Sequence, residues 1–178
     1  MKNRRTFLKD LGVASLATAL PLSQLNATSM LFPNNEVNVG LIGVRGMGWA
    51  NLNSFLKNAG TACVALCDVD SQLLEERAEE LKIKTGKRPK TFSDHRELLN
   101  LKTLQAVIIG TPDHWHCIQM TDACAAGKDV YVEKPIANSI HEADLMVEAA
   151  RKYNRVVQVG QWQRSDPHWI KALAFLKT

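Results

Sequence analysis

The chain has 178 residues, enough for one domain and little more. It carries 22 lysines and arginines against 18 acidic residues, and 46% of its residues are hydrophobic. Four of these basic residues and one acidic residue lie within residues 1–27, so the remainder holds 18 basic against 17 acidic residues. Most of the net positive charge therefore lies in residues 1–27, and we expect no nucleic-acid partner.

Residues 1–27 read as an export signal rather than as part of the fold. A basic head with the pair Arg4-Arg5 precedes an uncharged, moderately apolar run at 11–22. This run is too short to span a bilayer, which needs about 20 apolar residues. The two arginines followed by "TFLK" resemble a twin-arginine signal, the kind that directs folded proteins; a disordered basic tail is the alternative. We expect a periplasmic or otherwise exported protein without membrane association after export.

From residue 37 onward, apolar runs of strand length alternate with amphipathic runs of helix length. The predicted strands cover residues 37–42, 62–68, 89–93, 106–110, 129–133 and 156–160. The predicted helices cover 47–57 and 71–84, a short helix capped by Asp94 with Glu97, 112–127, a helix from the capping box at Ser139 to about 153, and a last helix opened by Asp166-Pro167. This order predicts an α/β fold, a Rossmann-like doubly wound parallel sheet that binds ligands outside the carboxyl ends of its strands.

The first predicted strand runs into "GVRGMGW", residues 43–49. Glycines between a strand and a helix let the backbone approach a pyrophosphate at the helix N-terminus. Gly43 and Gly48 fit the outer places of G-x-G-x-x-G, but Arg45 occupies the middle one, so either Gly46 makes the close approach or Arg45 contacts phosphate. A tight structural turn is the alternative.

The second predicted strand ends in Asp68, 20 residues after Gly48, where a carboxylate accepts the ribose hydroxyls of NAD. A carboxylate there repels a 2′-phosphate, so the sequence favours NAD over NADP. A solvated aspartate after a strand is the simpler alternative.

Polar residues also follow the fourth and fifth predicted strands. "TPDHWH" contains His114 and His116, which with Cys117 suggest a metal site, but residues two apart on a helix diverge, so we expect no metal. The four cysteines (Cys63, Cys67, Cys117 and Cys124) form no C-x-x-C pair and read as small buried residues. Glu133-Lys134-Pro135 ends the fifth strand, where a partly desolvated lysine can hold or pass a proton; the alternative is a surface lysine.

From residue 37 to about 178, the sequence resembles the Gfo/Idh/MocA oxidoreductases, named for glucose–fructose oxidoreductase and inositol dehydrogenase. The resemblance rests on "VGLIGVRGMG", "CDVD", "TPDHWH", "VGQWQRSDP" and above all "AAGKDVYVEKPIANSIHEA" with its E-K-P tripeptide. It implies a NAD-binding Rossmann domain at residues 36–160 and the start of an α+β substrate domain at 161–178. Because the last helix has no cap and no following strand, we expect a chain truncated before that second domain.

The resemblance also implies roles for individual residues. Gly43, Gly46 and Gly48 would approach the pyrophosphate and Asp68 the adenosine ribose. Thr111, Pro112 and His116 would line the nicotinamide pocket, with Glu133 close to the cofactor, and Arg164 would close over it. Lys134 would be the active-site lysine, which makes Lys134 and His116 the catalytic candidates.

The implied reaction is hydride transfer between NAD(P) and a hydroxyl carbon of a sugar, inositol or related polyol. Two alternatives remain open: an NAD-dependent glycoside hydrolase that oxidises the sugar ring transiently, and a non-catalytic nucleotide-binding remnant. The resemblance is also compatible with a homo-oligomer of a full-length form.

Overall fold

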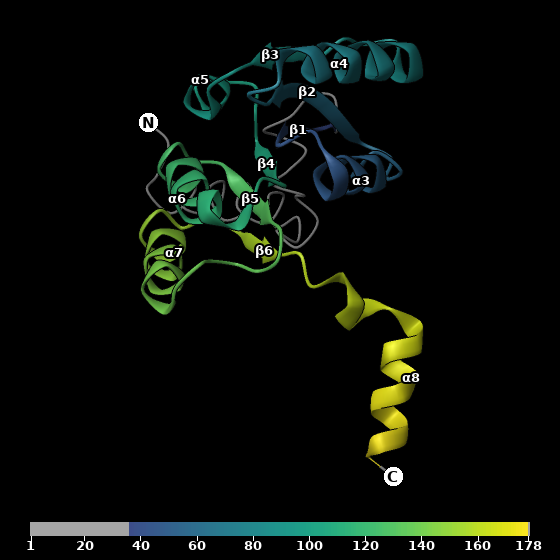
Figure 1. Cartoon of the computed structure of the whole chain (residues 1–178), viewed down its shortest axis with the longest axis vertical. Coiled ribbons are helices and arrows are strands. Elements are labelled where there is room, and N and C mark those ends of the chain that lie inside the picture. Colours follow the sequence, from purple (N-terminus) through teal and green to yellow (C-terminus); the bar gives the residue numbers. More distant parts are fainter. Residues whose placement is uncertain (1–35, 178) are drawn as a thin grey trace, which may run out of the picture. The chain divides into compact units, whose positions relative to one another are not determined.

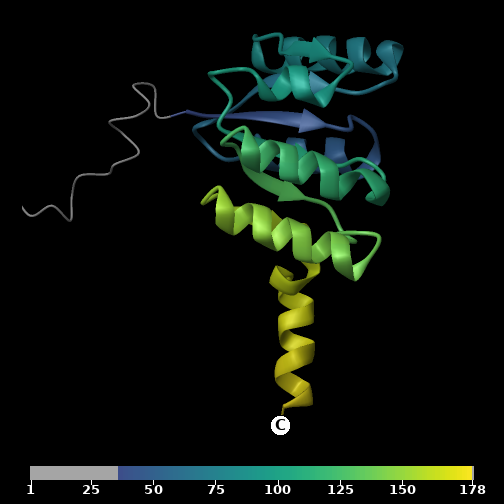
Figure 2. The same cartoon turned by 90° about the vertical axis from the view of Figure 1, so that its left-hand side faces the viewer.

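A computed structural model describes residues 36–177 (Figures 1 and 2). The export signal expected at residues 1–27 lies outside the described residues. The strands are β1 (Val37–Ile42), β2 (Thr61–Cys67), β3 (Lys90–Phe92), β4 (Ala106–Ile109), β5 (Asp129–Val132) and β6 (Val157–Val159). The helices are α3 (Gly46–Phe55), α4 (Ser71–Thr85), α5 (His95–Leu99), α6 (His116–Ala125), α7 (Ile140–Lys152) and α8 (Pro167–Leu176), with 3-10 turns η2 (Asp113–Trp115) and η3 (Trp162–Ser165).

The six strands form one parallel sheet in the order β3-β2-β1-β4-β5-β6. The chain moves outward from β1 to β3, returns across the sheet to β4, and then moves outward on the other side. The strand order therefore reverses between β1 and β4, and this is where such sheets bind ligands, outside the carboxyl ends of the strands. The predicted doubly wound parallel sheet is confirmed.

Helices cover both faces of the sheet, as strands with apolar residues on both sides require. One core cluster joins the sheet to α3 and α4, and includes Leu41, Leu52 and Leu81. The other joins it to α5, α6 and α7, and includes Ile42 and Met146. The two helix groups lie on opposite sides of the sheet in Figure 1. Neighbouring residues of β1 thus face different cores, because side chains alternate along a strand.

Side-chain caps define where several helices begin. Asp70 accepts from the Leu73 amide at the start of α4, Asp94 from the Arg96 amide at α5, and Asp166 from the His168 amide at α8. The capping box of α7 is only half as predicted. Ser139 accepts from the Glu142 amide, but the Glu142 carboxylate accepts from the Asn138 amide, one residue before the cap.

The fourth crossover also differs from the sequence expectation of one helix from Pro112. Residues 113–115 form the 3-10 turn η2, closed by a bond from the Trp115 amide to the Pro112 carbonyl, and α6 begins at His116. The Asp113 carboxylate accepts from the next amide, at His114, and this local bond competes with a regular first helical turn. The helix α6 ends at Ala125, two residues before the predicted end, and Gly127 has the predicted left-handed conformation, with a φ of +75°.

Candidate functional site

Three glycine backbones touch at the carboxyl ends of β1 and β4. A Cβ atom on Gly43, whose φ is +89°, would lie 2.8 Å from the backbone of Gly110, and one on Gly48 would lie 2.1 Å from the Gly43 carbonyl oxygen. Both distances are too short for a real Cβ atom, so only glycine allows the start of α3 to pack this closely on the sheet. The close packing brings the N-terminus of α3 to the switch point of the sheet.

The first turn of α3 has amide donors that no side chain caps. Its N-cap residue, Arg45, makes no side-chain cap bond, and no acidic residue lies in the first turn. A Cβ on Gly46 would meet nothing within 4 Å, so this backbone is open to an approaching group. Free amides at a helix N-terminus suit an anion such as a pyrophosphate. The residues present therefore fit a dinucleotide whose phosphates lie at this turn.

The Asp68 carboxylate braces the glycine-rich turn. Its Oδ2 accepts from the Val44 amide at 2.8 Å, and its Oδ1 accepts from the Asp70 amide at 3.0 Å. Each carboxylate oxygen has a second lone pair, so both can still accept from ribose hydroxyls. The predicted ribose-binding residue is thus held in position beside the predicted pyrophosphate turn.

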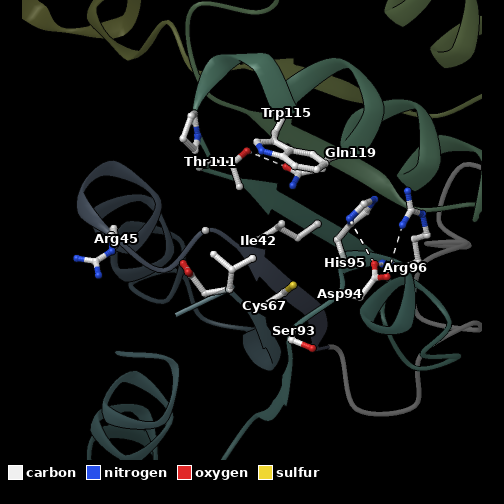
Figure 3. Close-up of a pocket in the computed structure, with 15 residues that line it drawn as sticks. Ile42, Arg45, Cys67, Ser93, Asp94, His95, Arg96, Thr111, Trp115 and Gln119 are labelled. Carbon is white, nitrogen blue, oxygen red and sulfur yellow. Dashed lines mark hydrogen bonds and ion pairs between the residues drawn. The ribbon is translucent and has the colours of Figure 1, made fainter. Parts of the chain in front are cut away.

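A cavity of about 500 Å³ opens on the β2 side of this turn (Figure 3). Arg45 lies at one end of it, and residues 94–96 lie at the other. Asp68 and Trp115 also line this cavity, as do Thr111 and Pro112, which were predicted to line the nicotinamide pocket. Trp115 is 44% exposed, so an aromatic face remains available for a planar ring. The size and chemistry of this cavity fit the adenosine half of a dinucleotide.

A second cavity, of about 640 Å³, lies on the other side of the turn. Met47, in the first turn of α3, lines it together with Lys134, after β5, and residues 160–164, after β6. Arg164 belongs to this last segment, so Lys134 and Arg164, the two cations predicted to lie near the nicotinamide, line the same cavity. Among the described residues, the Lys134 ammonium has no hydrogen-bond or ion-pair partner, which leaves it available to a ligand.

Glu133 lies beneath this second cavity and is only 4% exposed. Its Oε1 accepts from the Asn51 side-chain amide at 2.7 Å, and its Oε2 accepts from the backbone amide of Lys134 at 2.9 Å. A Cβ on Gly160 would approach Glu133 Oε1 to 2.9 Å, so the next strand also packs closely on this carboxylate. Glu133 therefore acts on the backbone that carries Lys134, rather than presenting itself in the cavity.

His116 is 1% exposed and joins two loops of the site. Its Nδ1 lies 2.8 Å from the Pro135 carbonyl oxygen and its Nε2 lies 2.9 Å from the Thr111 carbonyl oxygen. These two contacts fix the turn after β4 against the turn after β5, which gives His116 a positioning role. Its catalytic role stays a prediction. Thr111 is itself oriented by a 2.7 Å hydrogen bond from its hydroxyl to Gln119 Oε1.

The structure brings the predicted site residues together along one edge of the sheet. The turns after β1, β2, β4 and β5 carry, in this order, Gly43, Asp68, Thr111 with Pro112, and Glu133 with Lys134. Sequence reasoning missed Asn51, the partner of Glu133. Its signal was available, because Asn51 stands three residues after Gly48 on the buried face of α3, where a polar side chain requires a partner.

The residues at the far end of the first cavity were also missed. His95 is 6% exposed, and its Nε2 lies 2.9 Å from Asp122 Oδ2 on α6. Arg96 Nε lies 3.7 Å from the same oxygen. These contacts hold α5 against α6 and thereby position the end of the cavity. No pattern in the sequence joins α5 to α6, since they are separated by β4.

Within residues 36–177, no group of three or more His, Cys, Asp or Glu side chains is arranged to hold a metal ion. The four cysteines are free thiols, and Cys67 and Cys124 are buried. Burial raises the pKa of Cys63 and of Cys67 to about 12, so neither thiol is poised as a nucleophile. None of the helices in the described part of the chain has both the length and the apolar character to cross a membrane.

Comparisons with known proteins agree with this geometry. Residues 37–161 match the model of the Gfo/Idh/MocA family, described as an oxidoreductase family with a NAD-binding Rossmann fold. A curated relative from Shewanella sp. (strain ANA-3), glycosyl hydrolase family 109 protein 2, is 36% identical over 86% of this chain and 38% of its own length. The chain thus spans less than two fifths of this relative.

Solved structures give the same fold. A NAD binding oxidoreductase from Klebsiella pneumoniae superposes with a TM-score of 0.68 at 29% identity, over 80% of this chain and 38% of that one. A scyllo-inositol dehydrogenase from Lactobacillus casei, solved with bound NAD(H) and scyllo-inositol, gives a TM-score of 0.72 at 23% identity, over 80% and 41%. With the matched family model and the glycine-rich turn, these findings show that the chain belongs to the Gfo/Idh/MocA oxidoreductase family and contains its NAD-binding Rossmann domain.

Proposed function

We propose that the whole protein is an NAD-dependent oxidoreductase that acts on a hydroxyl group of a sugar, inositol or related polyol. The observation that carries this proposal is the cavity shared by Lys134, Arg164 and the first turn of α3. It supports a proton-handling amine beside the end of the dinucleotide site that lies away from Asp68. The substrate class is supported by the scyllo-inositol dehydrogenase among the structural neighbours, where the likeness itself is one of fold.

The roles of the residues follow from their positions. The α3 amides bind the phosphates, and Asp68 accepts from the ribose hydroxyls. NAD, when bound, supplies the acceptor or donor of a hydride. Lys134 takes or returns the proton of the substrate hydroxyl, on the carbon that loses or gains the hydride. The alcohol and the carbonyl compound therefore differ by one hydride and one proton. Glu133 and His116 position the two turns on which this transfer depends.

A second candidate function is an NAD-dependent glycoside hydrolase. It is favoured by the curated relative named for glycosyl hydrolase family 109, at 36% identity. In such a reaction, oxidation of the sugar ring is reversed within the same turnover, so NADH does not accumulate. The same cavity and the same lysine would serve both reactions. A third candidate, a remnant that binds the nucleotide without turnover, remains the outcome in which neither activity is found.

The discriminating experiment uses the longest natural form of the protein with NAD and a panel of sugars, polyols and aryl glycosides. Net NADH formation with a polyol or sugar supports the oxidoreductase, and release of the aglycone without net NADH supports the hydrolase.

Lys134→Ala should lower kcat by about 100-fold or more while NAD still binds, in keeping with the usual contribution of a general acid or base. The matched control is Lys102→Ala, an exposed lysine before β4 at the opposite edge of the sheet. An unchanged kcat in Lys134→Ala would remove this lysine from the mechanism.

The proposal includes export by the twin-arginine route and a role in carbohydrate metabolism outside the cytoplasm. It is supported by Arg4-Arg5 ahead of the uncharged run at 11–22. A reporter that becomes active only after export, fused after residue 35, should lose its exported signal when both arginines are changed to lysine, whereas Lys2→Arg should leave it intact. Equal export of the two fusions would count against this route. Light scattering of the exported form would test whether it is a homo-oligomer.

A further inference from the structure

The glycine-rich turn is connected to the turn after β2 by side chains at two points. Asp68 accepts from the Val44 amide, and the neighbouring Arg45 guanidinium forms an ion pair with the Asp70 carboxylate. Asp68 also accepts from the Asp70 amide, which joins the two contacts into one network. This network lies at the end of the first cavity that fits the adenosine ribose.

Arg45 is the cation at that end of the cavity. Among the described residues that line this cavity, Arg45 and Arg96 carry guanidinium groups, and Figure 3 shows them at opposite ends. Arg96 lies beside Asp94, at 3.5 Å, and Asp122. The side chain of Arg45 is 69% exposed, and Asp70 is the acid that it pairs with. A phosphate added to a ribose bound at Asp68 would therefore meet Arg45 as its nearest guanidinium.

We propose that Asp70 is a specificity-determining residue of this pocket. By pairing with Arg45, it withholds that guanidinium from a 2′-phosphate. The pocket is thereby selective for a dinucleotide whose adenosine 2′-hydroxyl is free. This inference rests on the proposed function only through NAD binding, and it assigns to Asp70 a role separate from the direct contact expected of Asp68.

Asp70 can be tested without removing the helix start that it also provides. Its Oδ1 accepts from the Leu73 amide at 3.1 Å, as the N-cap of α4. Asparagine retains a carbonyl oxygen at this place and is as good an N-cap as aspartate, but it has no charge to pair with Arg45. Asp70→Asn therefore separates the electrostatic role from the capping role. Asp70→Ser, another N-cap residue, is the second variant if the first does not fold.

The experiment measures the dissociation constants of NAD and NADP by calorimetry on the full chain. The wild type, Asp70→Asn, Arg45→Gln and the double variant are compared. The ratio of the NADP constant to the NAD constant should fall by about threefold to tenfold in Asp70→Asn, the scale of one exposed charge pair. It should return to the wild-type ratio in the double variant. The control is Glu76→Gln, which neutralises an exposed acid on α4 that accepts a hydrogen bond from Gln72, and it should leave the ratio unchanged.

Three results would overturn the inference. An unchanged ratio in both Asp70→Asn and Asp70→Ser would show that Asp70 does not select the cofactor. An equal fall in Glu76→Gln would reduce the effect to net charge, and a fall that persists in the double variant would remove Arg45 from the mechanism. A wild type that binds neither dinucleotide is a different result, because it would contradict the NAD-binding function itself.

Discussion

Glu133 is a buried acid whose two carboxylate oxygens each have a partner. The Asn51 side chain comes from α3, and the Lys134 amide comes from the residue that follows Glu133. A buried carboxylate is tolerated only where such donors replace the water it has lost. The helix α3, which begins at the glycine-rich turn, is thus bonded to the loop that carries Lys134.

Replacing Asn51 by leucine should destabilise the fold because Glu133 would lose its side-chain donor while remaining buried. The expected loss is about 1–3 kcal/mol in the free energy of unfolding, the usual penalty for an unsatisfied buried polar group. Urea denaturation would measure it. The control is Asn58→Leu, since Asn58 is exposed and donates only to the Phe55 carbonyl oxygen. If both variants lost the same stability, Glu133 would not need Asn51.

The sequence predicted where the site residues lie along the edge of the sheet, but it did not predict which partners their side chains contact. Gly43 and Asp68 were predicted because each directly follows a strand, and the carboxyl ends of parallel strands meet at one edge. Lys134 lies one residue further on, and only the resemblance carried by the E-K-P tripeptide distinguished it from a surface lysine. The ion pair of Arg45 with Asp70 could not be predicted, since it joins two turns that are 25 residues apart in the chain. Asn51 was missed because its partner is 82 residues away in the chain.

At the scale of elements, three helices, α4, α5 and α8, begin after an aspartate cap. Asp94 begins α5, and the Arg96 amide that donates to it lowers the pKa of this carboxyl below its ordinary value of 3.8. A carboxyl whose pKa is lower in the folded state contributes stability that is fully present above its unfolded pKa. That contribution is lost as the pH falls through the folded pKa.

Asp94→Asn should therefore weaken the pH dependence of stability without removing the cap. The variant has no carboxylate to protonate at this position, so its thermal midpoint should fall less steeply than that of the wild type as the pH is lowered below 3.8. Thermal unfolding at a series of pH values would measure the difference. Glu76→Gln is the control for removing an acid elsewhere, on the exposed face of α4. Parallel curves for wild type and Asp94→Asn would contradict the role of this carboxylate.

Element types followed from periodicity, whereas their ends followed from local hydrogen bonds. The strands and helices were predicted to within about two residues in most cases because apolar spacing differs between them. The turn η2 was predicted as regular helix, since the sequence does not reveal that Asp113 bonds the next amide. The Glu142 carboxylate likewise accepts from the Asn138 amide rather than from the amide of the cap residue, Ser139. Which amide faces the carboxylate depends on the backbone conformation before α7.

At the scale of the whole molecule, two cavities flank the start of α3. The first contains Asp68 and the second contains Lys134, and the glycine-rich turn separates them. A ligand with a phosphate bridge between two ring systems matches this arrangement, because each half would occupy one cavity. The order of the strands explains it, since the chain continues from β1 toward β2 on one side of this point and from β4 toward β5 on the other.

NAD should therefore stabilise the full chain against heat. A ligand present at 100 times its dissociation constant adds about 2.7 kcal/mol to the stability of the folded state. For a domain of this size, we expect the midpoint to rise by about 5–10 °C. Nicotinamide alone, which lacks the phosphates and the adenosine, is the control and should give no comparable shift at the same concentration. Equal shifts with the two compounds would contradict binding across both cavities.

Asp68 also bears on attempts to change cofactor preference. Replacing the acid at this place would remove the charge that repels a 2′-phosphate, and so would favour a phosphorylated coenzyme. In this chain the same carboxylate fastens the Val44 amide and so keeps the loop in shape. Such a substitution would therefore lower the affinity for NAD and for NADP alike. A redesigned pocket would first need another hydrogen-bond acceptor for the Val44 amide.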